Sequence, residues 1–352
     1  MVNVNDDDNG VSDDNNDNND YNLKPHNFKT SDMTYRELTA SEIQNLERQG
    51  CRCSDWSSIE VADGFSARDI HHVTFDGHVR IGANCRMANI GILRTTDGAT
   101  YGEGITISVL NEGGDGNLVF FRHLTSQLAA LMVRNCHDDA FWHNMCEMIY
   151  REVSTTRPSC TTIGDGVTIA DTRELTNVVV GNDCEITGAA RLVDCTLQST
   201  SEASILISDG VICDNCIIQA GASVTDFAKL YNTFVGEACH IGRGFTSENS
   251  AFFANSHMDN GESCAALCGP FSVSHHKSTL LIGGEYSFFN AGSGTNFSNH
   301  AYKMGPIHWG VLMRGSKTAS GSHILWPAQI GAFSMVMGKV QTHPDARKMP
   351  FS

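Results

Sequence analysis

The sequence predicts an all-β solenoid, a left-handed parallel β-helix built from hexapeptide repeats. Aliphatic residues recur every six positions, as at Ile163, Ile169 and Leu175. Glycine often follows the aliphatic residue, as in Ile81-Gly82. In such a repeat three short strands make one triangular coil of about eighteen residues. The aliphatic side chains face inward, and glycine or a small polar residue takes the tight corner.

The six-residue series is longest between about residues 163 and 253. It has a short start before residue 95, and its register slips by one residue between runs, as loops between coils allow. The runs are Ile81, Met87 and Leu93; Val180, Ile186 and Leu192; Ile205, Val211 and Ile217; Ile218, Val224 and Leu230; and Val235 and Ile241.

The cysteines support the same fold. The position two residues before an inward aliphatic residue also faces inward and must be small. Five of the thirteen cysteines stand there, which predicts that they pack as small hydrophobic side chains; they are Cys85, Cys184, Cys195, Cys216 and Cys239. A single Cys213-x-x-Cys216 pair is a poor zinc site without a second pair, so no metal ligands are predicted.

One helical segment precedes the β pattern, and another interrupts it. Thr39 and Glu42 have the spacing of a capping box and predict a short helix that ends near Gly50. Residues 123–153 show helical spacing of apolar side chains on both sides of an interruption at Asn135. We therefore expect a helical insertion packed on the solenoid, preceded by a hairpin-like stretch around Gly113-Gly114.

The N-terminal segment 1–33 has a different composition. Its first twenty residues hold seven Asp and seven Asn and no Lys or Arg. Such a segment buries too little apolar surface to offset its chain entropy, so we expect a disordered acidic tail before a β-helix domain at 34–352.

The composition also predicts a compartment. We find no basic stretch followed by an apolar one at the N-terminus, and no run of about eighteen apolar residues. Thirteen cysteines in a chain without a visible secretory signal favour free thiols in a reducing compartment. A cytoplasmic protein that contacts neither membrane nor nucleic acid is the expectation.

The C-terminal segment 271–352 carries the opposite charge to the rest. The whole chain has a net charge of -16, but this segment holds seven Lys or Arg against two acidic residues, a net charge of +5. It also holds six of the fifteen histidines. These features predict a binding region for an anionic small molecule, although a solvated basic face would have the same composition.

The order of motifs from residue 34 onward resembles a family of hexapeptide-repeat proteins known only as a domain of unknown function. The most specific segments are Gly269-Pro270, His275-His276-Lys277-Ser278-Thr279-Leu280-Leu281-Ile282, Asn290-Ala291-Gly292-Ser293-Gly294, Ser298-Asn299-His300, Gly305-Pro306-Ile307-His308 and Trp326-Pro327-Ala328. The resemblance implies a trimeric left-handed β-helix, the fold of many acyltransferases that act on sugars and nucleotide sugars. It implies no particular reaction.

The polar C-terminal segment contains the candidate site. We expect His276 to be the general base, with His275 and His300 as close alternatives, because a neutral imidazole can take a proton near pH 7. Lys277 and Lys303 are expected to hold phosphate groups. The full set of candidate ligand-binding residues is Lys277, Asn290, Ser293, Asn299, Lys303, His308 and Lys317.

Three function classes remain open on the sequence. The first is acyl transfer from acyl-CoA to a sugar-like or nucleotide-sugar acceptor by a homotrimer, which explains the local positive charge. The second is a metal-dependent hydratase that resembles the β-helical carbonic anhydrases, with histidines on zinc. The third is a scaffold or ligand-binding β-helix without catalysis. Bound metal would separate the first two classes.

Overall fold

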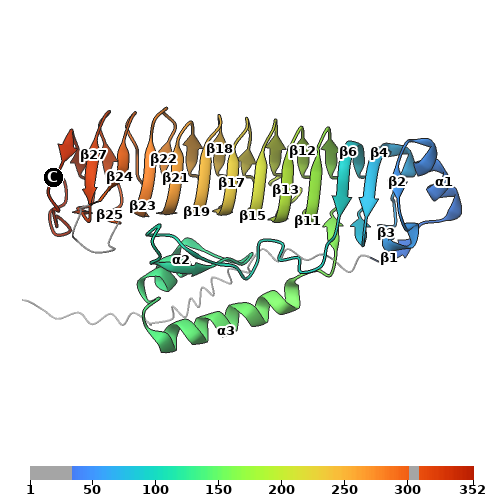
Figure 1. Ribbon diagram of the computed structural model, residues 1–352, viewed down its shortest axis with the longest axis horizontal. Helices are drawn as coiled ribbons and strands as arrows, with labels where there is room; N and C mark the ends of the chain where they lie inside the picture. The colour runs from blue at the N-terminus through green and yellow to red at the C-terminus, as the bar shows by residue number, and fades with distance from the viewer. Residues whose placement is uncertain (1–33, 301–308) are drawn as a thin grey trace, which may run out of the picture. The chain divides into compact units, whose positions relative to one another are not determined.

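The computed structural model describes residues 34–300 and 309–352, and its main body is a parallel β-helix (Figure 1). Each coil contributes one short strand to a first face, face A, and a longer, bent strand to two further faces, B and C. Strands of successive coils pair in parallel along each face. The predicted parallel β-helix is therefore confirmed, while the acidic tail at 1–33 lies outside the described residues.

Face A is formed by strands of two or three residues. They are β10 (Thr168–Ala170), β12 (Glu185–Thr187), β14 (Leu206–Ser208), β16 (Ser223–Val224), β18 (His240–Gly242), β20 (His257–Asp259), β22 (Val273–Ser274), β26 (Lys317–Thr318) and β29 (Met335–Val336).

Faces B and C share most of their strands. These are β11 (Glu174–Val180), β13 (Arg191–Leu197), β15 (Ile212–Ile218), β17 (Lys229–Val235), β19 (Thr246–Phe252), β21 (Glu262–Cys268) and β23 (Leu280–Tyr286). At the C-terminal end separate strands continue these faces: β24 (Asn296–His300), β25 (Val311–Leu312), β27 (His323–Trp326), β28 (Gln329–Ile330) and β30 (Lys339–Val340).

The regular coils contain seventeen residues rather than the eighteen that we expected. Ile207 pairs with Val224, Val224 with Ile241, and Ile241 with Met258, which are steps of seventeen. The missing residue is at the corner between faces B and C. Along one coil the inward residues Leu230 and Val235 are five positions apart, whereas Val224 and Leu230 are six apart.

This tight corner is made by a single residue with positive φ. Asn215, Asn232 and Asn249 occupy it in successive coils with φ of 53°, 47° and 48°. Asparagine tolerates the left-handed conformation better than most residues. Asn232 Nδ2 donates a hydrogen bond of 3.0 Å to Asn249 Oδ1, so the corners also form a ladder. The register slip in the sequence comes from these five-residue repeats, not from loops.

The interior of the described coils is mainly apolar, and it also holds a buried, hydrogen-bonded group formed by Thr233, Ser247, Ser250 and Ser263. It contains the predicted aliphatic residues except Ile217, for which the inward prediction is wrong because the five-residue step at the corner turns this side chain outward. All five cysteines assigned to inward positions lie inside, each at most 1% exposed. Each of the thirteen cysteines is unpaired. Cys213 and Cys216 are both fully buried in this core, so packing explains why these positions hold cysteine.

The N-terminal end of the β-helix is closed by a short helix and an antiparallel strand. Helix α1 (Ala40–Arg48) begins with the predicted capping box: Thr39 Oγ1 accepts from the Glu42 backbone, and the Glu42 side chain accepts from the Thr39 backbone. Strand β1 (Tyr35–Glu37) pairs with β3 in the antiparallel sense. The remaining strands here are β2 (Arg52–Cys53), β3 (Ile59–Ala62), β4 (Ile70–Asp76), β5 (Val79–Ile81), β6 (Arg86–Arg94) and β9 (Thr161–Ile163).

An insertion between β6 and β9 covers part of face C (Figure 1). It contains a hairpin, β7 (Thr106–Ser108) and β8 (Asn117–Val119), and two helices, α2 (Ser126–Arg134) and α3 (Asp139–Thr156). The helices lie where the helical insertion was predicted, and Asn135 ends the first of them. The apolar side chains of the whole insertion pack on outward-facing residues of face C, such as Ile217 and Phe234. Together they form a second hydrophobic core.

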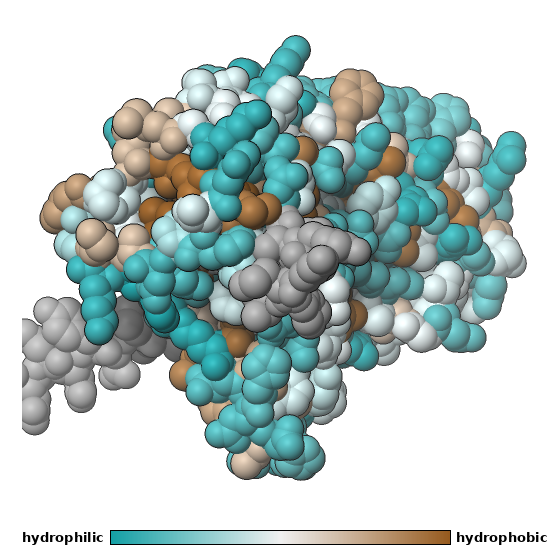
Figure 2. Space-filling view, turned by 60° about the vertical axis from the view of Figure 1, so that its left-hand side comes forward, coloured by the Kyte–Doolittle hydropathy of each residue, from teal (hydrophilic) through white to brown (hydrophobic). Residues whose placement is uncertain are grey.

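None of the described helices is both long enough and apolar enough to cross a membrane. Exposed apolar side chains are seen at the C-terminal end, among a surface that is otherwise mainly hydrophilic (Figure 2). They include Phe333, Met337, Met349 and Phe351.

Candidate functional site

Face A carries a row of four histidines from three successive coils. His240 and His257 are direct partners in the parallel strands β18 and β20, and their ring centroids are 4.6 Å apart. His275 follows on the next coil, 5.9 Å from the ring of His257, and its own ring is 4.2 Å from that of His276. Parallel pairing of successive coils therefore brings together imidazoles from three segments.

A buried carboxylate lies beside this row. The side chain of Asp259 is only 2% exposed, although it is on the outward side of β20. Its Oδ2 is 3.0 Å from His257 Nε2 and 3.5 Å from Arg243 Nε. Its Oδ1 is 3.5 Å from His240 Nε2 and receives no hydrogen bond from the described residues.

The absence of a side chain at Gly242 makes room for Asp259. Gly242 stands directly before Asp259 in the row of face A. A Cβ atom at this position would lie 2.9 Å from Thr225 Oγ1, 3.1 Å from Asp259 Oδ1 and 3.2 Å from His240 Nε2. Three polar atoms thus converge on a small space above the glycine.

The surroundings favour the neutral imidazole at two members of this row, His240 and His275. Burial lowers the pKa of His240, and the nearby His257 lowers it further, while Asp259 acts in the opposite direction. Burial also lowers the pKa of His275, with further contributions from His276 and His257. A neutral imidazole has a free lone pair, which can accept a proton or bind a metal ion.

Several residues predicted from the sequence lie on this face. His275 is half-buried, and His276 and Lys277 are exposed. Asn290 bridges Val273 and Lys317 in parallel, so it continues the face towards the C-terminus. Asn290 and Lys317 are both exposed.

Other predicted site residues lie elsewhere. Asn299 and His300 pair with Leu325 and Trp326 on face B, so the structure places them on a different face from His276. Ser293 is exposed at a corner, where its carbonyl accepts a hydrogen bond from the Gly321 backbone. The coil turns between these residues and His276, so the structure does not bring all of the predicted residues together on one face. Lys303 and His308 are outside the described residues.

His240, His257 and Asp259 were not predicted from the sequence as site residues. The signal was available, because His240 and His257 are seventeen residues apart, as are Gly242 and Asp259. An assumed coil of eighteen residues hides that alignment.

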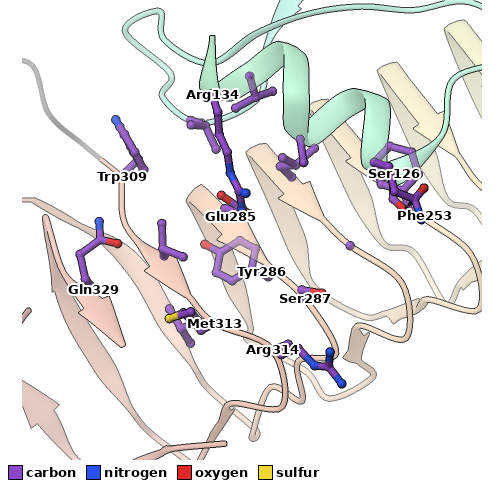
Figure 3. A pocket seen from close by; sticks show the side chains of 18 of the residues that line it. Ser126, Arg134, Phe253, Glu285, Tyr286, Ser287, Trp309, Met313, Arg314 and Gln329 are labelled. Carbon is purple, nitrogen blue, oxygen red and sulfur yellow. Dashed lines mark hydrogen bonds and ion pairs between the residues drawn. The ribbon is translucent and has the colours of Figure 1, made fainter. Parts of the chain in front are cut away.

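A groove of about 710 Å³ on face C is a second candidate (Figure 3). It lies beside α2, and its lining includes Leu267, Val311, Trp309 and Arg314. Most of its charged groups have ion-pair partners, whereas Arg314 contacts only the ring of Phe333, at 6.0 Å. Arg134 pairs with Glu285 at 2.6 Å across the groove, as Figure 3 shows.

Asp115, which also lines the groove, has both carboxylate oxygens occupied. Oδ1 is 2.9 Å from His137 Nε2, and Oδ2 accepts a hydrogen bond from Trp309 Nε1 at 3.1 Å. The face A cluster, with its buried and incompletely bonded carboxylate, is the stronger candidate for chemistry.

Comparison with known proteins agrees with the resemblance seen in the sequence. The chain is 25% identical over 381 aligned residues to an uncharacterized protein of Treponema pallidum (strain Nichols). The alignment covers 90% of this chain and 52% of that protein, so the chain spans about half the length of this relative. A family model described as "Domain of unknown function (DUF4954)" matches residues 35–87 and 80–352. The chain therefore belongs to this family.

Proposed function

We propose that the protein is an acyltransferase that moves an acyl group from acyl-CoA to a sugar-like or nucleotide-sugar acceptor at face A. The observation that carries this proposal is the pair His275 and His276, whose rings are 4.2 Å apart on a face that the described insertion leaves uncovered. The exposed Lys277 follows them directly and supplies positive charge for a phosphate-bearing ligand.

The pair supplies the general base. A neutral imidazole takes the proton of the acceptor hydroxyl or amine as the acceptor atom attacks the thioester carbonyl carbon. The new ester or amide bond forms, the carbon–sulfur bond breaks, and the thiolate leaves and is protonated to CoA thiol. Lys277 and Lys317 hold phosphates of the donor.

The acyl-CoA proposal includes a homotrimer. In that arrangement the donor lies along the solenoid between subunits, with face A of one chain turned towards its neighbour. Sedimentation equilibrium of the full chain is expected to give three times the chain mass of 38.2 kDa. A stable monomer would contradict both the trimer and a site shared between subunits.

A screen of acyl-CoA donors against sugar and nucleotide-sugar acceptors, read by release of free CoA thiol, tests the reaction. For an active donor and acceptor we expect His275→Ala and His276→Ala each to lower kcat/KM by about 10²–10⁴-fold. His143→Ala is the matched control, because that imidazole is 74% exposed on α3. Full activity in both face A variants, or no turnover with any donor, would overturn the proposal.

A metal-dependent hydratase is the second candidate. It is favoured by one observation, the set of His240, His257 and Asp259, whose potential ligand atoms all lie within 4.8 Å of one another. The hydratase would require bound metal, and metal removal would abolish hydration of its substrate. Acyl transfer by the histidine pair would survive removal of the metal.

A further inference from the structure

We infer that His240, His257 and Asp259 form a binding site for one divalent zinc-like cation per chain. The inference does not depend on acyl transfer, because it concerns binding and uses different residues from the proposed base. His240 and His257 would each bind through Nε2, and Asp259 through a carboxylate oxygen.

The distances suit a tetrahedral ion. Zinc bound at about 2.0–2.1 Å from its ligands places tetrahedral ligand atoms about 3.3–3.5 Å apart. The Nε2 atoms of His240 and His257 are 3.5 Å and 3.0 Å from the nearer oxygens of Asp259. The potential ligand atoms of the three residues all lie within 4.8 Å of one another, so one ion could bind all three after the side chains adjust.

The state of Asp259 points to a missing partner. A buried carboxylate is costly unless its oxygens are bonded. In the described residues Asp259 Oδ1 has no hydrogen-bond donor, although the side chain is 2% exposed. Arg243 approaches only the other oxygen, at 3.5 Å, and its side chain is 66% exposed. A cation beside Oδ1 would satisfy the group.

The space above Gly242 accommodates such an ion. Asp259 Oδ1 and His240 Nε2 both border the position of the missing Cβ, as does Thr225 Oγ1 at 2.9 Å. The φ angle of Gly242 is not in the left-handed region, so the backbone here does not require glycine. We attribute the glycine to the open space that it leaves.

The second contact of His240 also matches a metal ligand. Its Nδ1 is 2.8 Å from Ser223 Oγ on the preceding coil. When Nε2 binds a metal, Nδ1 carries the proton and donates it to an acceptor, which fixes the ring. His240 and His257 remain 40% and 43% exposed, so a fourth position is open to water or to a ligand.

The other cluster with suitable residue types is less suited. Asp115, Cys136 and His137 also bring three potential ligand atoms within 4.8 Å. Both oxygens of Asp115 already have hydrogen-bond partners, and His137 is 80% exposed. An ion there would have to displace existing bonds.

Zinc titration of the chelator-treated full chain, followed by calorimetry, tests the inference, and Co²⁺ absorption reports a tetrahedral site. We expect one ion per chain. His257→Ala and Asp259→Asn are expected to weaken zinc binding by more than about 100-fold. Loss of a residue that only hydrogen-bonds to a metal ligand already weakens binding by about 10–100-fold, and loss of the ligand itself should weaken it further. Gly242→Ala, which fills the space without changing a ligand, should also weaken it.

The controls are His143→Ala and Asp115→Asn, which should bind zinc like the wild type. Circular dichroism verifies that each variant is folded. If Asp259→Asn does not fold, Gly242→Ala and His257→Ala provide the test in its place. The inference is overturned if zinc does not bind stoichiometrically, or if Asp115→Asn removes the ion while Gly242→Ala and His257→Ala retain it. Because no substrate is used, failure here leaves the acyl-transfer proposal to its own test.

Discussion

The buried ion pair between Glu103 and Arg122 should contribute strongly to the stability of the folded insertion. Glu103 precedes the hairpin β7–β8 and Arg122 follows it, and their side chains are 0% and 6% exposed. Glu103 Oε1 accepts from Arg122 Nε at 2.7 Å and from its backbone N at 3.2 Å, and Oε2 accepts from Nη2 at 3.0 Å. The pair thus closes the neck of the hairpin.

Glu103→Ala would leave a buried guanidinium without its counterion. Removing one partner of a buried pair costs about 3–5 kcal/mol. With a urea m-value of about 3 kcal/mol per M, that is a fall in the unfolding midpoint of about 1 M or more. Far-UV circular dichroism and tryptophan fluorescence would follow the transition, because Trp142 packs in the insertion.

Two matched variants separate the buried charge from other effects. Asp345→Ala removes an acid from an exposed pair with Arg347 and should leave the midpoint unchanged. Replacing Glu103 and Arg122 together by methionine should recover most of the lost stability, since no unpaired charge remains. A midpoint for Glu103→Ala equal to that of Asp345→Ala would refute the reasoning.

Three further predictions concern the two cores and the corners. Phe234→Ala should lower the free energy of unfolding by about 3–5 kcal/mol, because the ring is fully buried between β17 and the insertion, whereas the 77% exposed Phe351→Ala should stay within about 0.5 kcal/mol; equal urea midpoints would contradict this. Burial raises the pKa of Cys85 and of Cys239 to about 12, so almost no thiolate exists at pH 8 and alkylation should wait for unfolding; fast native labelling by mass spectrometry would contradict it. Asn232→Ala should lower the free energy of unfolding in urea by about 1–2 kcal/mol, because alanine disfavours a φ of 47° and the hydrogen bond to Asn249 is lost. Asn232→Gly should lower it by less, because glycine adopts positive φ readily.

Much of the fold could be predicted because each coil of a β-helix repeats the same packing requirements within a short stretch of sequence. Most inward positions, such as those of Ile186 and Leu192, are aliphatic, and the position of Cys184 must be small, so the pattern repeats visibly. The capping box at Thr39 is likewise local. The five-residue repeat was missed because Asn232 is an ordinary polar residue unless its φ is known.

The site was predicted only in part for the same reason. The charge of the C-terminal segment drew attention to His275 and His276, which do lie on face A. Which face a residue occupies depends on the exact coil length, and one residue of error per coil moves a side chain round a corner. The sequence therefore did not reveal that His300 lies on a different face from His276, or that Gly242 aligns with Asp259.

Anomalous diffraction at the zinc edge, from crystals of the full chain grown with zinc, would test the face A cluster most directly. We expect a peak at about 2.0–2.2 Å from His240 Nε2, His257 Nε2 and one oxygen of Asp259. The ion should occupy the space above Gly242. A peak at Asp115 instead, or intact cluster side chains with no peak between them, would contradict the assignment of this cluster as a metal site.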